Sequence, residues 1–416
     1  MKNNRIIWMI VLSALIMTSC SSKSDDGVTV NEKQFKPLIS INLTNEQQQY
    51  VNKTNDFAFH LTTAVTKTDK NNVLLSPLSA AYVLGMLENG ANGNTRSQII
   101  SALGFGNNDD NTVNDYFNRL LTGAPKVDES VTIDIANAVI ADKQFPLKSD
   151  YVNTVCNQYQ ASVENVDFNN TDVASKVNNW ASDHTNGMIK KILDQVGPDA
   201  CMYAMNAIYF KGVWSNEFDE KNTKTETFTA EDGTKEDVKM MHRNDYLLYT
   251  ANDIYSVVQL PYGNGGYRMM LILPAEGKNI DNVLASLDGS SWMATLNNMI
   301  NYDVDLTLPR FSTEFNITMN EALENLGITD AFDKNKADFS RLSDVSAYLS
   351  RVLQKCKMDV DEKGTESAAV TVAEMVDMAN IETTVHKADF HANRPFIYLI
   401  TEHTTGSIYF IGIKSK

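Results

Sequence analysis

The order of apolar and polar residues along the chain predicts helices first and strands afterwards. In segments 45–66 and 77–87, apolar residues recur at spacings of three and four, which places them on one face of an α-helix. Asn45 and Ser76 are candidate N-caps of these helices, and Pro77 suits a first helical turn. We expect helices to dominate up to about residue 195.

From Ala204 onward the chain changes to short runs rich in β-branched and aromatic residues. The runs NAIYFKGVW, VVQLPY, YRMMLILP and VDLTLPRF are bounded by Pro, Gly or Asn, as strands commonly are. Helices followed by strands indicate an α+β fold. Because no internal repeat or Pro-rich linker divides the body, we expect a single domain over residues 46–416.

A long run near the C-terminus lacks turn residues and fits two structures. After Gly364 there is no glycine or proline until Pro395. In a β-strand, successive side chains point to opposite faces. If the run after Gly364 forms a strand, one of its faces carries no charge, and Glu366 and Glu374 lie on the other face. The same residues, taken alone, also favour an amphipathic surface helix, because Ala, Glu and Met have high helix propensity. The uncharged alternate positions are Thr365, Ser367, Ala369, Thr371, Ala373 and Met375.

The N-terminus is predicted to be an export signal. Lys2 and Arg5 precede an apolar stretch over 6–17, which is too short for a stable membrane span but suits a cleaved signal over 1–19. The following MTSC resembles a bacterial lipobox, which implies lipidation of Cys20, although Met17 stands where Leu is usual. Ordinary secretion is the alternative.

The segment after Cys20 is small, polar and acidic, so residues 20–45 are expected to form a solvated tether. Acidic residues soon after the cysteine resemble the surface-export signals of some Gram-negative lipoproteins. These features predict an outer-membrane lipoprotein on the surface or periplasmic face, held to the membrane only through its N-terminal lipid.

Composition narrows the range of functions. The chain has 416 residues, 43% of them hydrophobic, which is enough for a large core. A formal net charge of -16, with no basic run outside the first few residues, argues against nucleic-acid binding.

No motif of catalysis, metal binding or cofactor binding is found. Cys156, Cys201 and Cys356 form no disulfide framework or CxxC pair, and we expect three buried thiols. HExxH, GxSxG and the phosphate-binding glycine loops are missing from the sequence. We therefore expect neither an enzyme nor a cofactor, although a triad assembled from distant residues stays open as an alternative.

Six stretches, in order and at about the family's spacing, resemble the serpins. The resemblance implies three β-sheets, eight or nine helices, and an exposed reactive-centre loop over about residues 362–390. The stretches are residues 72–99, 206–219, 303–315, 326–344, 359–369 and 390–414.

The resemblance implies suicide inhibition of a serine protease by a monomer. The protease would attack the loop and form an acyl-enzyme, and the cut loop would then insert as a new strand of the central sheet. The uncharged alternate face of the run suits such a buried strand, although Ser367 and Val370 depart mildly from the family's residues. The hinge residues implied are Glu362, Gly364, Thr365, Glu366, Ser367, Ala368 and Ala369.

The position of the reactive bond is less well defined. The family's usual count of seventeen residues from Glu362 places it between Met378 and Ala379, whereas counting back from Pro395 points to 381–384. We favour the hinge count, because trapping depends on the inserted length. Methionine suits elastase-, chymotrypsin- or subtilisin-like serine proteases, and papain-like cysteine proteases stay open. The interval from Lys363 to Lys387 contains no further Lys or Arg, which disfavours trypsin-like targets.

Further residues match family positions that control the opening of the sheet. Trp214 matches a tryptophan at the top of the sheet, and Arg310 with Glu362 matches an ion pair at the point where the loop leaves the sheet. The residues matching the shutter beneath the sheet are Ser76, Ser79, Asn206 and Gln354, the last in place of the family's usual His.

The alternative function is that of a non-inhibitory serpin, which acts as a binding or chaperone module. For such a serpin we would expect a charged or bulky residue on the uncharged face of the hinge, and this sequence has none there.

Overall fold

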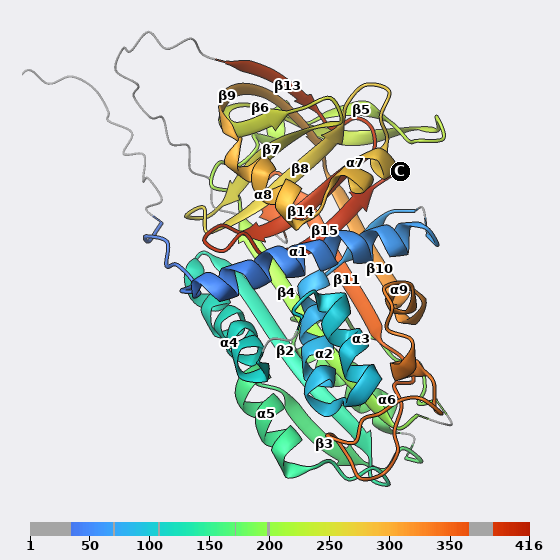
Figure 1. Cartoon of the computed structure of the whole chain (residues 1–416). Coiled ribbons are helices and arrows are strands. Elements are labelled where there is room, and N and C mark those ends of the chain that lie inside the picture. The colour runs from blue at the N-terminus through green and yellow to red at the C-terminus, as the bar shows by residue number, and fades with distance from the viewer. Residues whose placement is uncertain (1–34, 70, 107–108, 171, 198–199, 366–385) are drawn as a thin grey trace, which may run out of the picture.

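The computed structural model describes residues 35–69, 71–106, 109–170, 172–197, 200–365 and 386–416 (Figure 1). The predicted signal, Cys20, most of the tether, the hinge residues from Glu366 on and the bond between Met378 and Ala379 lie outside these ranges. No helix in the described ranges has the length and apolar character needed to cross a membrane.

The first two predicted helices are present, with small differences at their ends. The cap of the first helix is Thr44 rather than Asn45, because Thr44 is still extended and its side chain accepts a hydrogen bond from the Gln47 backbone. Ser76 caps the second helix as predicted, and that helix continues to Gly90 rather than residue 87. The described helices are α1 (Asn45–Thr66), α2 (Pro77–Gly90), α3 (Gly93–Leu103), α4 (Asp110–Val127), α5 (Ser149–Tyr159), α6 (Asp172–Asp183), α7 (Ile280–Ser286), α8 (Gly289–Asn297) and α9 (Asn320–Asn325).

Strands also occur in the first half, so the simple division into helices and then strands is wrong. These strands are β1 (Val73–Leu75), β2 (Val131–Asp142) and β3 (Ser162–Val166). In the second half of β2 both faces are covered: Val139 joins the main core, and Ile140 packs in a separate cluster with Val177 of α6. Burial on both faces removes the alternation of apolar and polar residues that marks a half-exposed strand.

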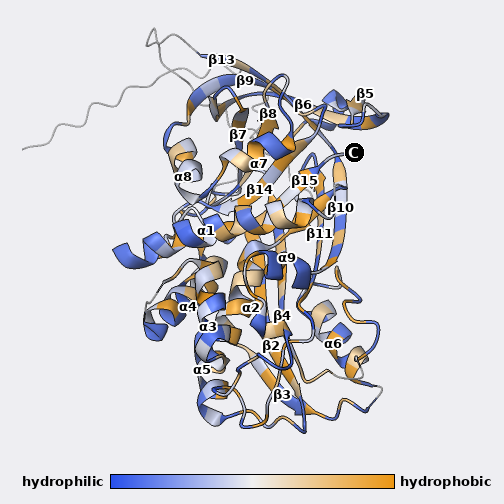
Figure 2. Ribbon diagram, turned by 45° about the vertical axis from the view of Figure 1, so that its right-hand side comes forward, coloured by the Kyte–Doolittle hydropathy of each residue, from blue (hydrophilic) through white to orange (hydrophobic). Residues whose placement is uncertain are grey.

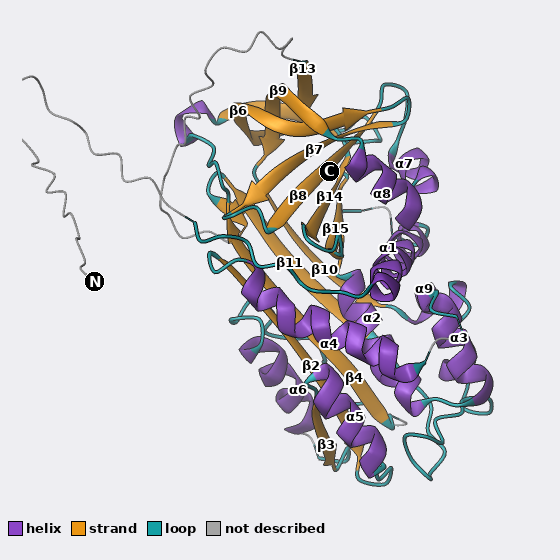
Figure 3. Cartoon of the chain, turned by 60° about the vertical axis from the view of Figure 1, so that its left-hand side comes forward, coloured by secondary structure: helices purple, strands orange, loops and turns teal. Residues whose placement is uncertain are grey.

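A six-stranded sheet forms the lower part of the molecule in Figure 1. Its order is β10-β11-β12-β4-β2-β3, with β2 parallel to β3 and the other neighbours antiparallel. Helices α2, α4 and α5 lie across one face of this sheet, as Figure 3 shows. The strands not yet placed are β4 (Met202–Val213), β10 (Phe311–Thr318), β11 (Leu353–Asp361) and β12 (Gly364–Thr365).

A nine-stranded sheet forms the upper part. Its order is β1-β15-β14-β8-β7-β6-β9-β13, and β5 pairs with β6. The long β6 pairs with β9 over most of its length and with β7 near its end, so two of the three expected sheets are continuous through one strand. The remaining strands are β5 (Lys224–Thr229), β6 (Lys235–Ala251), β7 (Tyr255–Tyr262), β8 (Tyr267–Pro274), β9 (Ile300–Pro309), β13 (Lys387–His391), β14 (Phe396–Glu402) and β15 (Ile408–Lys414).

Helix α2 is buried along its whole length, and it packs against β4 and β15. Figure 2 shows hydrophobic stretches along β2 and β4, and a mixture of hydrophobic and hydrophilic residues along α1. A relative shift of the strands in the six-stranded sheet would therefore displace the side chains that pack against α2, because a close-packed interior transmits such displacements.

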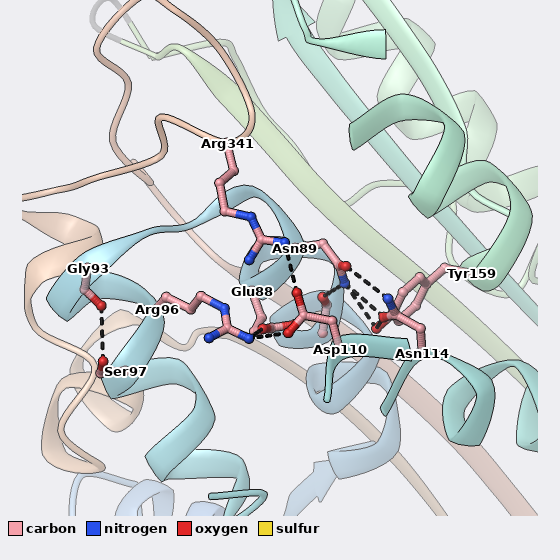
Figure 4. Close-up of polar contacts among 10 residues, drawn as sticks. Glu88, Asn89, Gly93, Arg96, Ser97, Asp110, Asn114, Tyr159 and Arg341 are labelled. Atoms are coloured by element: carbon pink, nitrogen blue, oxygen red, sulfur yellow. Dashed lines mark hydrogen bonds and ion pairs between the residues drawn. The ribbon is translucent and has the colours of Figure 1, made fainter. Parts of the chain in front are cut away.

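A partly buried ionic cluster joins α2 to its neighbours (Figure 4), and Glu88 is its buried member. Arg96 Nη2 of α3 lies 2.6 Å from Glu88 Oε1 of α2 and also contacts Asp110 of α4. Arg341 Nη2 approaches the other oxygen of Asp110 at 2.8 Å. Burial, together with the nearby charge of Asp110, raises the pKa of Glu88 even though Arg96 opposes this shift.

The expectation of three buried thiols is wrong for one cysteine. Cys201 and Cys356 are buried, but Cys156 is exposed on α5. The buried positions of that helix are Tyr151, Val155 and Tyr159, and Cys156 follows Val155 directly. Adjacent helical residues point about 100° apart, which turns this thiol toward solvent.

Candidate functional site

The candidate site lies where the chain enters the six-stranded sheet at β12. Gly364 and Thr365 pair with Asp361 and Val360 of β11 on one side, and with β4 on the other. In the hydrogen-bonded order of the described strands, β12 stands between β11 and β4, and no ladder joins those two strands directly. Gly364 and Thr365 belong to the start of the predicted exposed loop, yet they are buried and already occupy a central strand position.

A tight turn brings the chain from β11 back into this position. Asp361 Oδ1 accepts hydrogen bonds from the backbone N–H groups of Lys363, at 2.9 Å, and Gly364, at 3.2 Å. Gly364 has a φ of 152°, and a Cβ at this residue would lie 2.1 Å from the Gly212 carbonyl oxygen. Glycine is therefore required where the turn meets β4.

Trp214 holds this turn from the other side, at the end of β4. Its indole Nε1 donates to the Asp361 carbonyl at 2.9 Å, and its backbone N–H donates to Lys363 O at 2.9 Å. The indole also stacks on Tyr262, with ring centroids 4.4 Å apart and planes 13° apart. The tryptophan predicted at the top of the sheet thus contacts the hinge itself.

Tyr262 is a site residue that the sequence did not reveal. Its hydroxyl lies 2.6 Å from Thr365 Oγ1, and both side chains are buried. Burial raises the pKa of Tyr262, so it stays neutral and can share this hydrogen bond. Sequence reasoning identified VVQLPY only as a strand, because nothing in its pattern distinguishes the last residue from an ordinary core tyrosine.

Arg310 and Glu362 lie in direct contact. Arg310 Nη2 donates to both carboxylate oxygens of Glu362, at 2.6 and 2.7 Å, and Thr223 Oγ1 donates to Oε1 at 2.7 Å. Burial of Glu362 raises its pKa, but the hydrogen bonds from Arg310 and Thr223 outweigh this effect, so the net pKa is lowered. The carboxylate is therefore ionised and fixes the start of the turn.

Ser76 and Gln354 also meet beneath the sheet. Gln354 Oε1 accepts from the Ser76 backbone N–H at 3.0 Å, and its Nε2 donates to Ser76 O at 2.8 Å. The Ser76 hydroxyl donates to Tyr409 O at 2.8 Å. The glutamine that stands in place of the family's usual His thus links β11 to the start of α2.

Asn206 does not join that network, and Ser79 joins it only through its backbone N–H, which donates to Ser76 Oγ at 3.3 Å. Asn206 Nδ2 donates instead to Asn137 Oδ1 at 2.8 Å, on the neighbouring strand β2. The Ser79 hydroxyl and Asn206 Oδ1 are buried without a hydrogen-bond partner among the described residues. The polar groups therefore form one set attached to β11 and another attached to β4, the two strands that β12 separates.

The arrangement suits the growth of a strand. At the top, Trp214, Tyr262 and the Arg310–Glu362 pair hold β12 between β11 and β4. Lower down, none of the side-chain hydrogen bonds of Ser76, Gln354 and Asn206 crosses from β11 to β4. A chain that continued from Thr365 toward the Met202 end of β4 could therefore pair on both sides.

Comparison with known proteins shows the family to which the chain belongs. A family model described as Serpin (serine protease inhibitor) matches residues 52–415. Human Serpin B4 is 32% identical over 379 residues, which cover 86% of this chain and 96% of the relative. An uncharacterized serpin-like protein of Methanosarcina acetivorans is 30% identical over 370 residues, covering 86% and 85% of the two chains.

Solved structures give the same result. The thermophilic serpin tengpin, in its native state, superposes with a TM-score of 0.82 at 31% identity, covering 94% of this chain and 100% of tengpin. Thyroxine-binding globulin in complex with thyroxine superposes with a TM-score of 0.78 at 28% identity, covering 88% and 99%.

Proposed function

The chain belongs to the serpin family, and we propose that it is a suicide-substrate inhibitor that traps a protease as a covalent acyl-enzyme. The observation that carries this proposal is the position of β12: Gly364 and Thr365 already pair between β11 and β4. The proposed inserted strand thus has a nucleus in place, and its extension would add pairs in register with both neighbours.

The proposed reaction begins at the loop outside the described residues. The nucleophile of the protease attacks the carbonyl of the residue before the reactive bond, an ester or thioester forms, and the new amino terminus leaves. The acylated segment then inserts from Thr365 onward. About fourteen residues at roughly 3.3 Å each would carry the protease on the order of 45 Å along the strand axis.

Two features of the site support insertion on energetic grounds. Thr365 is 1% exposed, so its side of the new strand faces the core, and the alternate residues that would follow it on this face are uncharged. Each added ladder hydrogen bond contributes about 1 kcal/mol net, and burial of the uncharged face adds to this. Burial of a charged side chain would oppose insertion. Insertion is therefore proposed to be faster than hydrolysis of the ester only when the inserted face carries no charge.

The proposed targets are serine proteases of elastase-, chymotrypsin- or subtilisin-like specificity. This rests on Met378 as the residue before the reactive bond, with Ala379 after it.

We further propose that the chain is an exported lipoprotein anchored through Cys20. Labelling of cells with a radioactive fatty acid would test this anchor. A Cys20→Ala variant that still takes up the label would contradict this anchor.

Incubation with elastase followed by denaturing electrophoresis tests the inhibitory proposal directly. An inhibitor yields a band with the summed mass of protease and chain, and mass spectrometry of the released fragment locates the cut. Simple cleavage without such a band, with elastase, chymotrypsin, subtilisin and papain alike, would favour the alternative of a non-inhibitory binding module. Thyroxine-binding globulin shows that a similar structure can hold a small molecule.

A further inference from the structure

Three potential metal ligands meet on the open face of the upper sheet. Asp305 lies on β9, and Asp389 and His391 lie on β13; one ligand atom from each lies within 4.8 Å of the others. His391 Nε2 is 3.4 Å from Asp305 Oδ2. Neither the inhibitory proposal nor the hinge involves these residues.

The parallel ladder between β9 and β13 explains why they meet. Asp389 is the direct neighbour of Asp305, and His391 follows two residues later on the same face of β13. Phe390, between them, is fully buried on the opposite face. The buried phenylalanine fixes the register, and the register fixes the three polar side chains on the outside.

The electrostatics of the cluster favour a cation. Two carboxylates on adjacent strands at directly opposite positions repel each other. The neighbouring pair on the same face, Asp303 and Lys387, has opposite charges, with 3.7 Å between the charged atoms. For Asp305, the basic group within ion-pair distance among the described residues is His391, whose Nε2 is shielded from solvent and makes no hydrogen bond there.

We propose that Asp305, Asp389 and His391 bind a divalent transition-metal cation of the Zn²⁺ type. One imidazole nitrogen and two carboxylate oxygens form a set of three protein ligands, which leaves a further position for water. The imidazole distinguishes this site from the all-oxygen sites that Ca²⁺ and Mg²⁺ prefer.

The proposed cation would join β13 to β9. β13 has only five residues, and β9 is its neighbouring strand in the sheet. Separation of β13 from β9 would remove some of the cation's ligands. Because the cation binds only the paired strands, it stabilises their paired state by mass action.

A consequence for regulation rests on the proposed inhibitory function. β12 points toward the Met202 end of β4, whereas β13 lies at the opposite end of the molecule (Figure 1). An uncleaved loop that inserted fully would therefore pull β13 away from β9. By holding β13, the cation would slow this loss of active inhibitor without hindering insertion after cleavage.

Equilibrium dialysis and thermal shift of the untagged chain with Zn²⁺ alone test the site. We expect one bound ion, a raised melting temperature with Zn²⁺ but not with Mg²⁺, and binding weakened on the order of tenfold or more in His391→Ala and Asp305→Asn. The matched control is His242→Ala, since His242 lies on the same face, 2.7 Å from Glu226. A Cys156→Ser control excludes zinc held by the exposed thiol. Unchanged binding in both site variants would overturn the proposal.

Hydrogen exchange separates the clamp from the inhibitory function. We expect Zn²⁺ to slow exchange of the β13 backbone amides in the wild-type chain but not in His391→Ala, a result that requires no protease. Equal exchange with and without Zn²⁺ would refute the clamp. If the chain also inhibits elastase, Zn²⁺ should slow the loss of inhibitory capacity on warming. A chain that binds Zn²⁺ but inhibits nothing would refute only the proposed function.

Discussion

The hydroxyl of Tyr262 lies 2.6 Å from Thr365 Oγ1, in the core and one residue before Glu366, the next residue of the predicted hinge. This contact links β7 of the upper sheet to β12 of the lower sheet. It also fixes which side of the chain faces the core at the point where insertion would continue, so the side-chain register of the whole inserted strand follows from it.

Replacing Thr365 with Arg should convert an inhibitor into a substrate. The site is 1% exposed, and an unpaired buried guanidinium costs several kcal/mol, enough to displace β12 from its neighbours. Electrophoresis after incubation with elastase should then show cleaved chain in place of covalent complex. Thr365→Ser, which keeps the hydroxyl, should retain the complex. Wild-type yield of complex in Thr365→Arg would refute the proposed strand register.

Removing the charge of Glu362 should loosen the hinge and promote polymerisation. Gln at this position weakens two charge-assisted hydrogen bonds from Arg310, a loss of about 2 kcal/mol. Size-exclusion chromatography after prolonged warming should show oligomers, formed when a loop pairs with the open sheet of a neighbour. Glu220→Gln, at an exposed carboxylate near the same turn, is the control. If Glu362→Gln stays as monomeric as this control, the ion pair does not prevent the sheet from pairing with the loop of a neighbour.

The same contact predicts a pH dependence. The pKa of Glu362 is lowered in the folded chain below its ordinary value of 4.5. Its stabilising contribution is therefore complete above pH 4.5 and is lost as the pH falls through the folded-state pKa. Polymerisation of the wild-type chain should rise on acidification in that range, while Glu362→Gln should show little change. Parallel profiles for the two chains would contradict this assignment.

The contribution of Glu88 to stability should depend on pH in the opposite direction. Its pKa is raised by burial, so the folded state favours the protonated form, and the ionised carboxylate destabilises the fold as the pH rises. Glu88→Gln should raise the melting temperature at pH 7, and the gain should disappear below the ordinary pKa of 4.5. Glu324→Gln, on the exposed side of α9, is the control. A lower melting temperature for Glu88→Gln at pH 7 would mean that its pairing with Arg96 outweighs burial.

The two polar sets beneath the sheet should act independently. Gln354→Ala leaves the buried N–H and C=O of Ser76 without their partner, at a cost of about 1–3 kcal/mol for each group. Asn206→Ala removes a different bond, to Asn137. Because the sets share no partner, the two losses should add within about 0.5 kcal/mol in urea unfolding. A coupling energy well above this would mean that the sets form one network.

Cleavage within 370–384 should stabilise the chain, whereas a cut normally destabilises a protein. Roughly a dozen new ladder bonds at about 1 kcal/mol each would exceed the stability of an ordinary domain. Calorimetry before and after limited proteolysis should show a melting temperature higher by tens of degrees. An unchanged or lower value would mean that the loop does not insert.

The sequence by itself determined the helix periods and the cap at Ser76, whereas the requirement for glycine at 364 became visible only where the turn meets β4. The helix periods and the cap depend on local rules: the spacing of apolar residues, and a side-chain oxygen next to a free N–H. The resemblance across six stretches also identified the family, since the order of several motifs is visible without a structure.

Only the tertiary structure decided the rest. Tyr262 meets Thr365, and Asp305 meets Asp389, because ladders and stacked rings join segments far apart in the chain, and no periodicity encodes which partners will face each other. The separation of Gln354 from Asn206 likewise follows from β12 lying between β11 and β4. Cys156 is exposed because the register of α5 against its neighbours was fixed by three buried side chains, not by the thiol.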